Sequence, residues 1–126
     1  MAIGAELTHA LRNFSAVERE IVGSGQRVSP DNALEFVKQR RQLVLCFADL
    51  GNALEKDPWL STQPDIIRAG RQYFSAFRAA NSINQANWPV VKAKDDPDGY
   101  RVAARPVGEK SRAFWAWAEQ ELGFKR

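Results

Sequence analysis

Apolar residues between Ser61 and Trp88 recur every three or four positions and form two adjacent stripes. One stripe is Ile66, Ala69, Tyr73, Ala76, Ala80 and Ile83, and the other is Ile67, Gly70, Phe74, Phe77, Asn81, Asn84 and Trp88. Residues with this spacing lie along one side of an α-helix, so the segment predicts a long helix with a wide apolar face. One neighbouring helix cannot cover such a face. The pattern therefore predicts a helical bundle, with part of this face left for a partner outside the chain.

Two earlier segments repeat the spacing of four and three. The first contains Ile3, Leu7, Ala10, Phe14, Val17 and Ile21, and the second contains Phe36, Arg40, Leu43, Phe47, Leu50 and Leu54. Seams of this kind are typical of helices packed lengthwise against each other. We expect the first helix to stop at residues 23–25, which are Gly-Ser-Gly, and the second to start at residues 29–31 with Ser29 as its cap. It should end near Asp57, because Pro58 disfavours α geometry in the residue before it.

The third helix is expected to begin at a partial capping box formed by Thr62 and Asp65, with Pro64 tolerated in the first turn. The loop before it is short, so the second and third helices should be antiparallel neighbours. After Pro89, two short apolar segments flank the turn-forming residues 95–99, which predicts either a small β-hairpin or an extended loop near residues 90–105. A last, short helix is expected over residues 109–122, with Gly123 as its stop. The predicted fold class is mostly α: a single helical domain, residues 1–126, built as an antiparallel bundle of three long helices plus a short C-terminal helix.

Composition agrees with a folded globular chain. Hydrophobic residues make up 44% of the 126 positions and charged residues 26%, which is enough for a core without disulfides or metals. Cys46 is the only cysteine and lies in an apolar stretch, so a small buried hydrophobe is expected there. No secretory signal and no apolar run of membrane-spanning length is visible, which predicts a cytoplasmic protein without membrane association.

The net charge of +3 and the pI of about 9.3 raise the question of nucleic acid. Residues 27–89 and residues 90–126 each hold eight basic and six acidic side chains, so the positive excess is spread along the chain. Surfaces that bind phosphate usually concentrate their charge on one face. The distribution therefore disfavours nucleic acid as a partner.

Candidate chemistry is sparse. His9 is the only histidine, which excludes a histidine-based metal cluster, and neither a glycine-rich phosphate loop nor a GxSxG motif is present. Asp95, Asp96 and Asp98 lack the spacing and terminal Glu of an EF-hand, so local turn hydrogen bonds are the preferred interpretation. We expect no catalytic site, no metal and no cofactor, and hence no enzyme.

Three features interrupt the apolar pattern. Arg40 lies in an otherwise apolar seam, where it would pair with an acid across the bundle, lay its stem on the core with its head in water, or recognise a carboxylate on a partner. Asn81 and Asn84, with Asn87, form a polar line that is either a solvated helix end or a set of amides that bond to a partner backbone or to the following loop. The aromatic C-terminus is either core or an element that docks reversibly; its members are Phe114, Trp115, Trp117 and Phe124.

Residues 34–99 resemble the flagellar type III export chaperones, especially those of hook-associated proteins. The resemblance is carried by Lys-Gln-Arg-Arg-Gln-Leu at residues 38–43, by Arg-Ala-Ala-Asn-Ser-Ile-Asn at residues 78–84, and by Asp-Gly-Tyr at residues 98–100. It implies a small cytoplasmic protein of long antiparallel helices. Its client would be a C-terminal amphipathic helix of a secreted structural protein. In this reading Ile67, Phe74 and Phe77 supply the apolar groove, and Asn81 and Asn84 satisfy polar groups at its end.

The sequence thus predicts a non-enzymatic binding protein, a chaperone that sheathes an amphipathic helix of an exported flagellar protein. The predicted partner-binding residues are Ile67, Phe74, Phe77, Asn81, Asn84 and Arg40. Two alternatives stay open. One is a basic helical regulator that contacts nucleic acid through Arg40, Arg41, Arg68, Arg71 and Arg78, and the other is a self-associating structural protein. The client, the pathway and the oligomeric state are not predicted.

Overall fold

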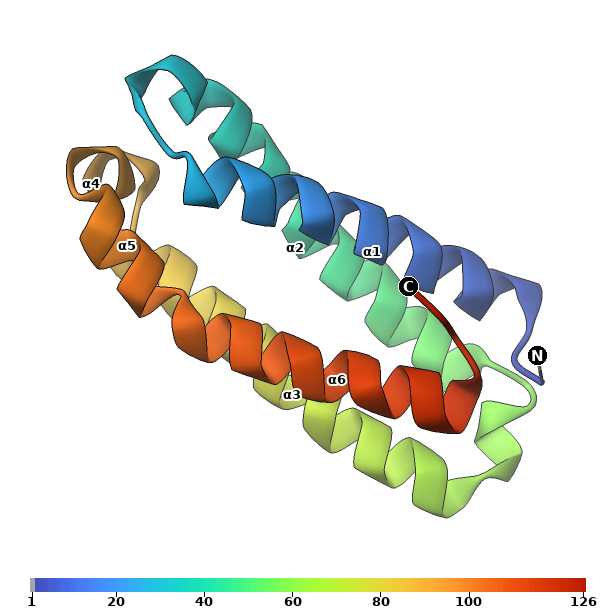
Figure 1. Cartoon of the computed structure of the whole chain (residues 1–126). Coiled ribbons are helices and arrows are strands. Elements are labelled where there is room, and N and C mark those ends of the chain that lie inside the picture. The colour runs from blue at the N-terminus through green and yellow to red at the C-terminus, as the bar shows by residue number, and fades with distance from the viewer. Residues whose placement is uncertain (1) are drawn as a thin grey trace.

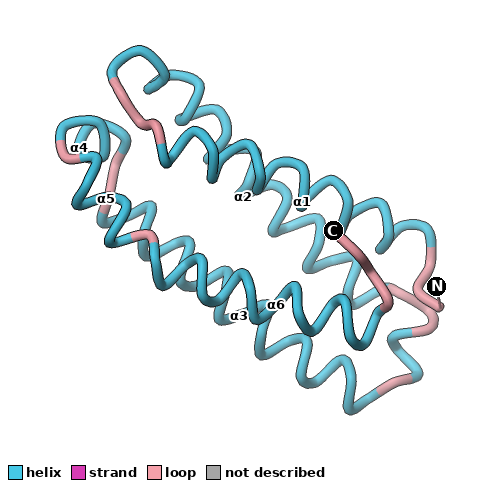
Figure 2. Tube along the Cα trace, viewed as in Figure 1, coloured by secondary structure: helices cyan, strands magenta, loops and turns pink. Residues whose placement is uncertain are grey.

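Two helical hairpins stacked face to face make up the structure, a computed structural model that describes residues 2–126 (Figure 1). The first hairpin pairs α1 (Ala5–Gln26) with α2 (Ala33–Lys56), and the second pairs α3 (Pro64–Asn87) with α6 (Arg105–Leu122). The short helices α4 (Val90–Asp95) and α5 (Pro97–Ala103) lie between α3 and α6 at one end of the molecule. Figure 2 shows that the described residues contain helices and loops and no strand.

The two layers meet through aromatic side chains. The Phe14 ring of α1 packs edge-on against Phe47 of α2, with 4.7 Å between their centroids, and Phe47 packs in turn against Phe77 of α3 at 4.9 Å. Phe77 then contacts Phe114 of α6 at 6.1 Å. Edge-to-face pairs of this kind stabilise a core beyond the area that they bury. All four long helices therefore contribute to one continuous core.

The expected neighbours α2 and α3 run antiparallel, but each pairs more closely with another helix. Gly70 explains the pairing of α3 with α6. A Cβ atom at Gly70 would lie 2.2 Å from Cζ2 of Trp117, so only glycine lets α3 come this close to the indole. The second stripe of α3, which contains Ile67, Gly70, Phe74 and Phe77, is consequently covered by the chain's own α6.

Several predicted helix ends need correction. The first helix does not stop at residues 23–25 but continues to Gln26, where Ser24 and Gly25 are buried and the Tyr100 ring occupies the space beside Gly25. Ser29 does cap a helical start, but a 3₁₀ turn (Pro30–Asn32) comes first and α2 begins at Ala33. The predicted end near Asp57 is confirmed. Gln63 rather than Thr62 precedes α3, because the Thr62 hydroxyl donates to the Trp59 carbonyl instead of capping.

Both predictions for residues 90–105, a hairpin or an extended loop, are wrong. The turn formers act as helix ends here: Asp96 accepts a hydrogen bond from the Gly99 amide at 3.1 Å, and Pro97 occupies the first turn of α5. The C-terminal helix is also longer than predicted, since it begins at Arg105, so the bundle has four long helices rather than three. Gly123 ends it with a φ of 70°, as predicted. Within residues 2–126, no helix combines the length and the apolar character that crossing a membrane requires.

Candidate functional site

A cleft of about 660 Å³ opens between the two hairpins, near the end that carries α5. Its walls are the second half of α1, two residues of α2, the last turns of α3, the end of α5 and the beginning of α6. Apolar side chains form part of its surface, among them Ile21 and Val22 from α1, Leu43 from α2, Phe77 from α3 and Val107 from α6. The volume lies in the range of sites that hold small molecules or short peptide segments.

The charge of this cleft is strongly one-sided. Its lining contains a single carboxylate, that of Glu18, and six guanidinium groups, which belong to Arg19, Arg40, Arg101, Arg105, Arg112 and Arg126. Arg101 is paired with Asp98 and also donates to the Gln26 carbonyl. In the described part of the chain, Arg19, Arg105 and Arg112 have neither an ion pair nor a hydrogen bond, and we call these three the rim arginines. The cleft is thus suited to a negatively charged ligand.

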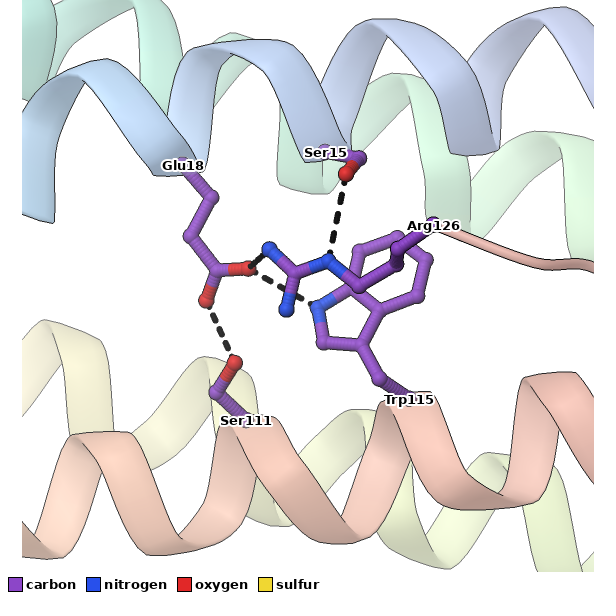
Figure 3. A network of polar contacts seen from close by, with 5 residues as sticks. All are labelled: Ser15, Glu18, Ser111, Trp115 and Arg126. Carbon is purple, nitrogen blue, oxygen red and sulfur yellow. Dashed lines mark hydrogen bonds and ion pairs between the residues drawn. The ribbon is translucent and has the colours of Figure 1, made fainter.

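The carboxylate of Glu18 is already fully engaged (Figure 3). It accepts hydrogen bonds from the Ser111 hydroxyl and from Nε1 of Trp115, the latter at 2.8 Å, and it forms an ion pair with Arg126. Arg126 also donates to the Ser15 hydroxyl at 3.1 Å and stacks on the Trp115 ring. We call this network of Ser15, Glu18, Ser111, Trp115 and Arg126 the Glu18 clasp. It joins α1 to α6 and to the C-terminal residues. It also cancels the one negative charge of the lining, which leaves Arg40 and the rim arginines without a counter-charge.

Arg40 is the buried arginine of the cleft, with 8% of its surface exposed. Nη1 donates to the Trp88 carbonyl at 2.6 Å, and the guanidinium lies over the rings of Phe36 and Tyr100, 4.7 and 5.7 Å from their centroids. No carboxylate of the described residues pairs with it, and its Nη2 atom has no hydrogen-bond partner there. The interpretation of an acid paired with Arg40 across the bundle is therefore wrong for the described residues, and the guanidinium lies mostly inside the protein, with Nη2 closed off from solvent.

The asparagines at the end of α3 face the interior. Asn81 and Asn84 are both buried and line the cleft, whereas Asn87 is exposed. The Asn84 amide donates to the Ala103 carbonyl at 3.3 Å, which agrees with the predicted bond to the following segment. The Asn81 side chain makes no hydrogen bond with the described residues. The alternative of a solvated helix end is wrong for these two positions.

Ile67, Phe74 and Phe77 do not form the open groove that the sequence suggested. Phe77 is 1% exposed and the other two less than a tenth, because α6 and the Phe47 ring cover them. Of the three, only Phe77 reaches the cleft. A partner-binding role for Ile67 and Phe74 stays a prediction, and Phe74 lines a separate hollow between α2 and α3.

The aromatic C-terminus belongs to the core. Phe114, Trp115, Trp117 and Phe124 are all buried, so packing rather than reversible docking describes them in this structure. Cys46 is buried as predicted, beside the Asn13 amide. Burial raises the pKa of its thiol above the ordinary value, and the nearby negative charge of Asp49 raises it further. Such a thiol is a poor nucleophile near neutral pH.

The five arginines considered for nucleic acid do not form one free surface. Arg40 is buried, Arg68 pairs with Asp65, and Arg71 makes two hydrogen bonds to Glu55 at 2.8 and 2.7 Å. The Arg71 hydrogen bonds lower the pKa of the Glu55 carboxyl. Arg41 and Arg78 are left without such partners in the described chain.

The rim arginines were missed by sequence reasoning, although one signal was present. Arg105, Gly108 and Arg112 are spaced three and four apart, which places them on one side of α6. Gly108 leaves space beside the Arg112 guanidinium, which would lie 3.3 Å from a Cβ atom at that position. Arg19 comes from the opposite hairpin, and nothing in the local pattern of α1 connects it to them.

No protein-family model matches this chain. Neither a curated protein nor a solved structure matches it either. The function is therefore argued from the geometry of the cleft.

Proposed function

We propose that this protein is a non-enzymatic binding protein that holds an acidic, partly apolar segment of a partner polypeptide in the cleft between its hairpins. The unbalanced charge of the cleft carries this proposal. Three exposed arginines with no partner in the described chain and one buried arginine without a counter-ion surround apolar walls. An acidic segment supplies the missing negative charge, and its apolar side chains fill the space between the helices.

The chemistry of the lining supports binding rather than catalysis. Arginine is not deprotonated near neutral pH, so the guanidinium groups cannot act as bases. Glu18 is the one carboxylate of the lining and is committed to donors from Ser111, Trp115 and Arg126. The lining contains neither histidine nor cysteine. Apart from the Tyr100 hydroxyl, a general base or nucleophile would have to be drawn from these committed groups.

The extent of the cleft limits how much of a helix it can contact. Its lining spans residues 18–26 of α1 and 105–112 of α6, at one end of the bundle. The cleft therefore suits one end of a helix rather than its whole length. This differs from the sheath predicted from α3, which would cover an amphipathic helix along its side.

The resemblance to flagellar export chaperones supplies a candidate partner. Under that hypothesis the segment is part of an exported flagellar protein, and binding in the cleft shields an apolar helix end before export. The prediction of a chaperone and the proposal of a cleft agree on the class of ligand, which is an amphipathic helical segment.

A pair of short peptides tests the proposal. Fluorescently labelled Ac-EALELL and Ac-KALKLL, both with free carboxyl termini, share their apolar positions and differ in charge. We expect the acidic peptide to bind and its affinity to fall as salt rises, because exposed charges are screened. The lysine peptide should bind at least tenfold more weakly in fluorescence anisotropy.

Variants locate the site. Arg105→Gln combined with Arg112→Gln removes two rim arginines and should weaken the acidic peptide, whereas the matched pair Arg68→Gln and Arg78→Gln, outside the cleft, should not. Equal binding of both peptides, or no binding of the acidic one, contradicts the proposal. If only the control pair loses binding, the peptide binds outside the cleft.

A further inference from the structure

The side of α2 that faces away from the core carries exposed apolar side chains. Leu34, Val44 and Leu45 have 69%, 49% and 65% of their surfaces exposed. Val37 and Val44 of α2, with Val90 of α4, also line a shallow groove of about 440 Å³. We call this side of α2, together with the groove, the outer α2 face. Neighbouring exposed apolar side chains of this kind mark a surface that another molecule covers.

Four charged residues of the outer α2 face are separated by sign along the helix. Lys38 and Arg41 lie in its first half, whereas Asp49 and Glu55 lie in its second half. All four are exposed, and the first three have no ion pair within residues 2–126. Glu55 accepts two hydrogen bonds from Arg71, and its oxygens have positions left for another donor. A face with this order of charges is complementary to a copy of itself that runs in the opposite direction.

Helical spacing defines how two such faces meet. One seam of the outer α2 face has residues spaced four and three apart, which are Leu34, Lys38, Arg41, Leu45, Ala48, Asn52 and Glu55. When two antiparallel seams place Leu45 opposite Ala48 of the second copy, Lys38 lies opposite Glu55 of that copy. This register therefore joins apolar residues at the centre of the seam and opposite charges toward its ends.

Other arrangements and other occupants fit these charges less well. A parallel pair of α2 helices would bring Lys38 and Arg41 against the same basic residues of the second copy, and like charges repel. An anionic membrane surface would attract these two residues but repel Asp49 and Glu55. The mixed signs of the face thus favour a second copy of the chain in the antiparallel direction.

We propose that two copies of this chain form a two-fold symmetric dimer through their outer α2 faces, with the two α2 helices antiparallel. The exposed apolar side chains of the face are then buried between the copies, and Lys38 of each copy pairs with Glu55 of the other. In the same register Glu35 in the first turn of α2 comes close to Lys56 in the last turn of the second copy. This inference goes beyond the proposed function and does not depend on it.

Sedimentation equilibrium measures the association at about 1–200 µM chain, because a narrow interface of this kind is expected to have a micromolar dissociation constant. Leu45→Asp places two carboxylates near the centre of the interface and should weaken the dimer by at least about tenfold. Ile83→Asp is the matched control: Ile83 is 61% exposed on α3 and lies outside the outer α2 face, so its variant should dimerise like the parent chain. Circular dichroism checks that both variants keep the helical content of the parent.

A charge exchange tests the direction of the two helices. Lys38→Glu brings like charges together twice in the symmetric interface and should weaken the dimer about fivefold to tenfold. Glu55→Lys, added in the same chain, restores opposite charges in the antiparallel register and should recover most of this loss. It also removes the hydrogen bonds from Arg71, an exposed pair whose loss costs little stability. In a parallel pair positions 38 and 55 never meet, so the exchange would recover nothing.

The outcomes separate the dimer from the proposed function. A chain that is monomeric up to about 200 µM overturns the inference, and so does a dimer that Leu45→Asp leaves unchanged. A loss in Lys38→Glu that the exchange does not recover overturns the antiparallel arrangement. Arg40 and Gln85 line both the groove and the cleft and therefore lie between them. Leu45→Asp should accordingly bind Ac-EALELL like the parent, and a chain that dimerises without binding this peptide overturns the proposed function alone.

Discussion

The Glu18 clasp makes a quantitative prediction about how the two hairpins are held together. Glu18→Gln keeps the size of the side chain but replaces one carboxylate oxygen by an NH₂ group. That oxygen position faces donors, because the Ser111 hydroxyl, Nε1 of Trp115 and the Arg126 guanidinium all point at the carboxylate. The amide can keep its oxygen toward Trp115 and Arg126 and turn its NH₂ group toward Ser111, whose hydroxyl then accepts while its own proton loses the carboxylate acceptor.

The magnitude follows from how buried each partner is. Ser111 is buried, and the hydroxyl proton left without an acceptor costs about 1–3 kcal/mol. Loss of the charge weakens the remaining bonds by about 1 kcal/mol, since charge-assisted bonds exceed neutral ones by about that amount. Arg126 has 30% of its side chain exposed, so water can hydrate its guanidinium when the ion pair is lost. The loss of this ion pair therefore adds little to the change in the free energy of unfolding. Glu18→Gln should therefore lower the free energy of unfolding by about 2–4 kcal/mol.

Urea unfolding followed by circular dichroism and tryptophan fluorescence measures this loss. Trp115 belongs to the Glu18 clasp, so its fluorescence should report the local change as well. Glu20→Gln is the matched control: Glu20 is exposed on the same helix, and its variant should stay within about 0.5 kcal/mol of the parent. The reasoning is refuted if Glu18→Gln is as stable as Glu20→Gln, because the buried donors would then be satisfied without the carboxylate.

Three further predictions concern single positions. Gly70→Ala places a Cβ atom 2.2 Å from the Trp117 ring and should lower the free energy of unfolding by about 1–3 kcal/mol, even though alanine favours helices. Urea unfolding measures this loss, and an unchanged midpoint would contradict the close approach of α3 and α6. Cys46 should react with iodoacetamide at pH 8 far more slowly in the folded protein than in urea, because burial and Asp49 raise the pKa of its thiol. The same shift means that the unfolded thiol ionises first, so stability should fall as pH rises above the ordinary thiol pKa, and a Cys46→Ala variant should lack this component. Asn81→Leu should weaken the binding of Ac-EALELL, because it removes an amide that lines the cleft and has no hydrogen-bond partner in the described chain; unchanged binding in fluorescence anisotropy would show that Asn81 takes no part.

The long helices were predictable because their signal is local. Apolar spacing of three and four over twenty or more residues defines α1, α2 and α3, and Pro58 and Gly123 mark ends whose backbone geometry they dictate. The prediction for the segment after Pro89 was wrong for the opposite reason. Helices of six and seven residues contain less than two turns of pattern, and the turn formers that suggested a hairpin serve instead to begin α5.

The pairing of the helices was less accessible to sequence reasoning. Chain order suggested that α2 and α3 are antiparallel neighbours, and they are, but the contact of Gly70 with Trp117 brings α6 still closer to α3 from a distant part of the sequence. The sequence shows that Gly70 interrupts an apolar stripe, but it does not show that Trp117 packs against this glycine. Since α6 covers that stripe, the groove expected from Phe74 and Phe77 is filled by the chain itself.

The position of the cleft nevertheless follows from the sequence once the antiparallel direction of α2 and α3 is known. Along α2 the apolar seam is interrupted by Arg40, which precedes Leu43; along α3 the seam ends at Phe77 and continues with Asn81. Because the two helices run in opposite directions, the start of α2 lies beside the end of α3, and the polar residues of both seams come to the same end of the bundle. Beyond Leu43 and Phe77 the two seams contain Arg40, Asn81 and Asn84, and these three residues line the cleft. The residues that interrupt the helix pattern are thus polar residues of the cleft in which we propose that an acidic segment binds.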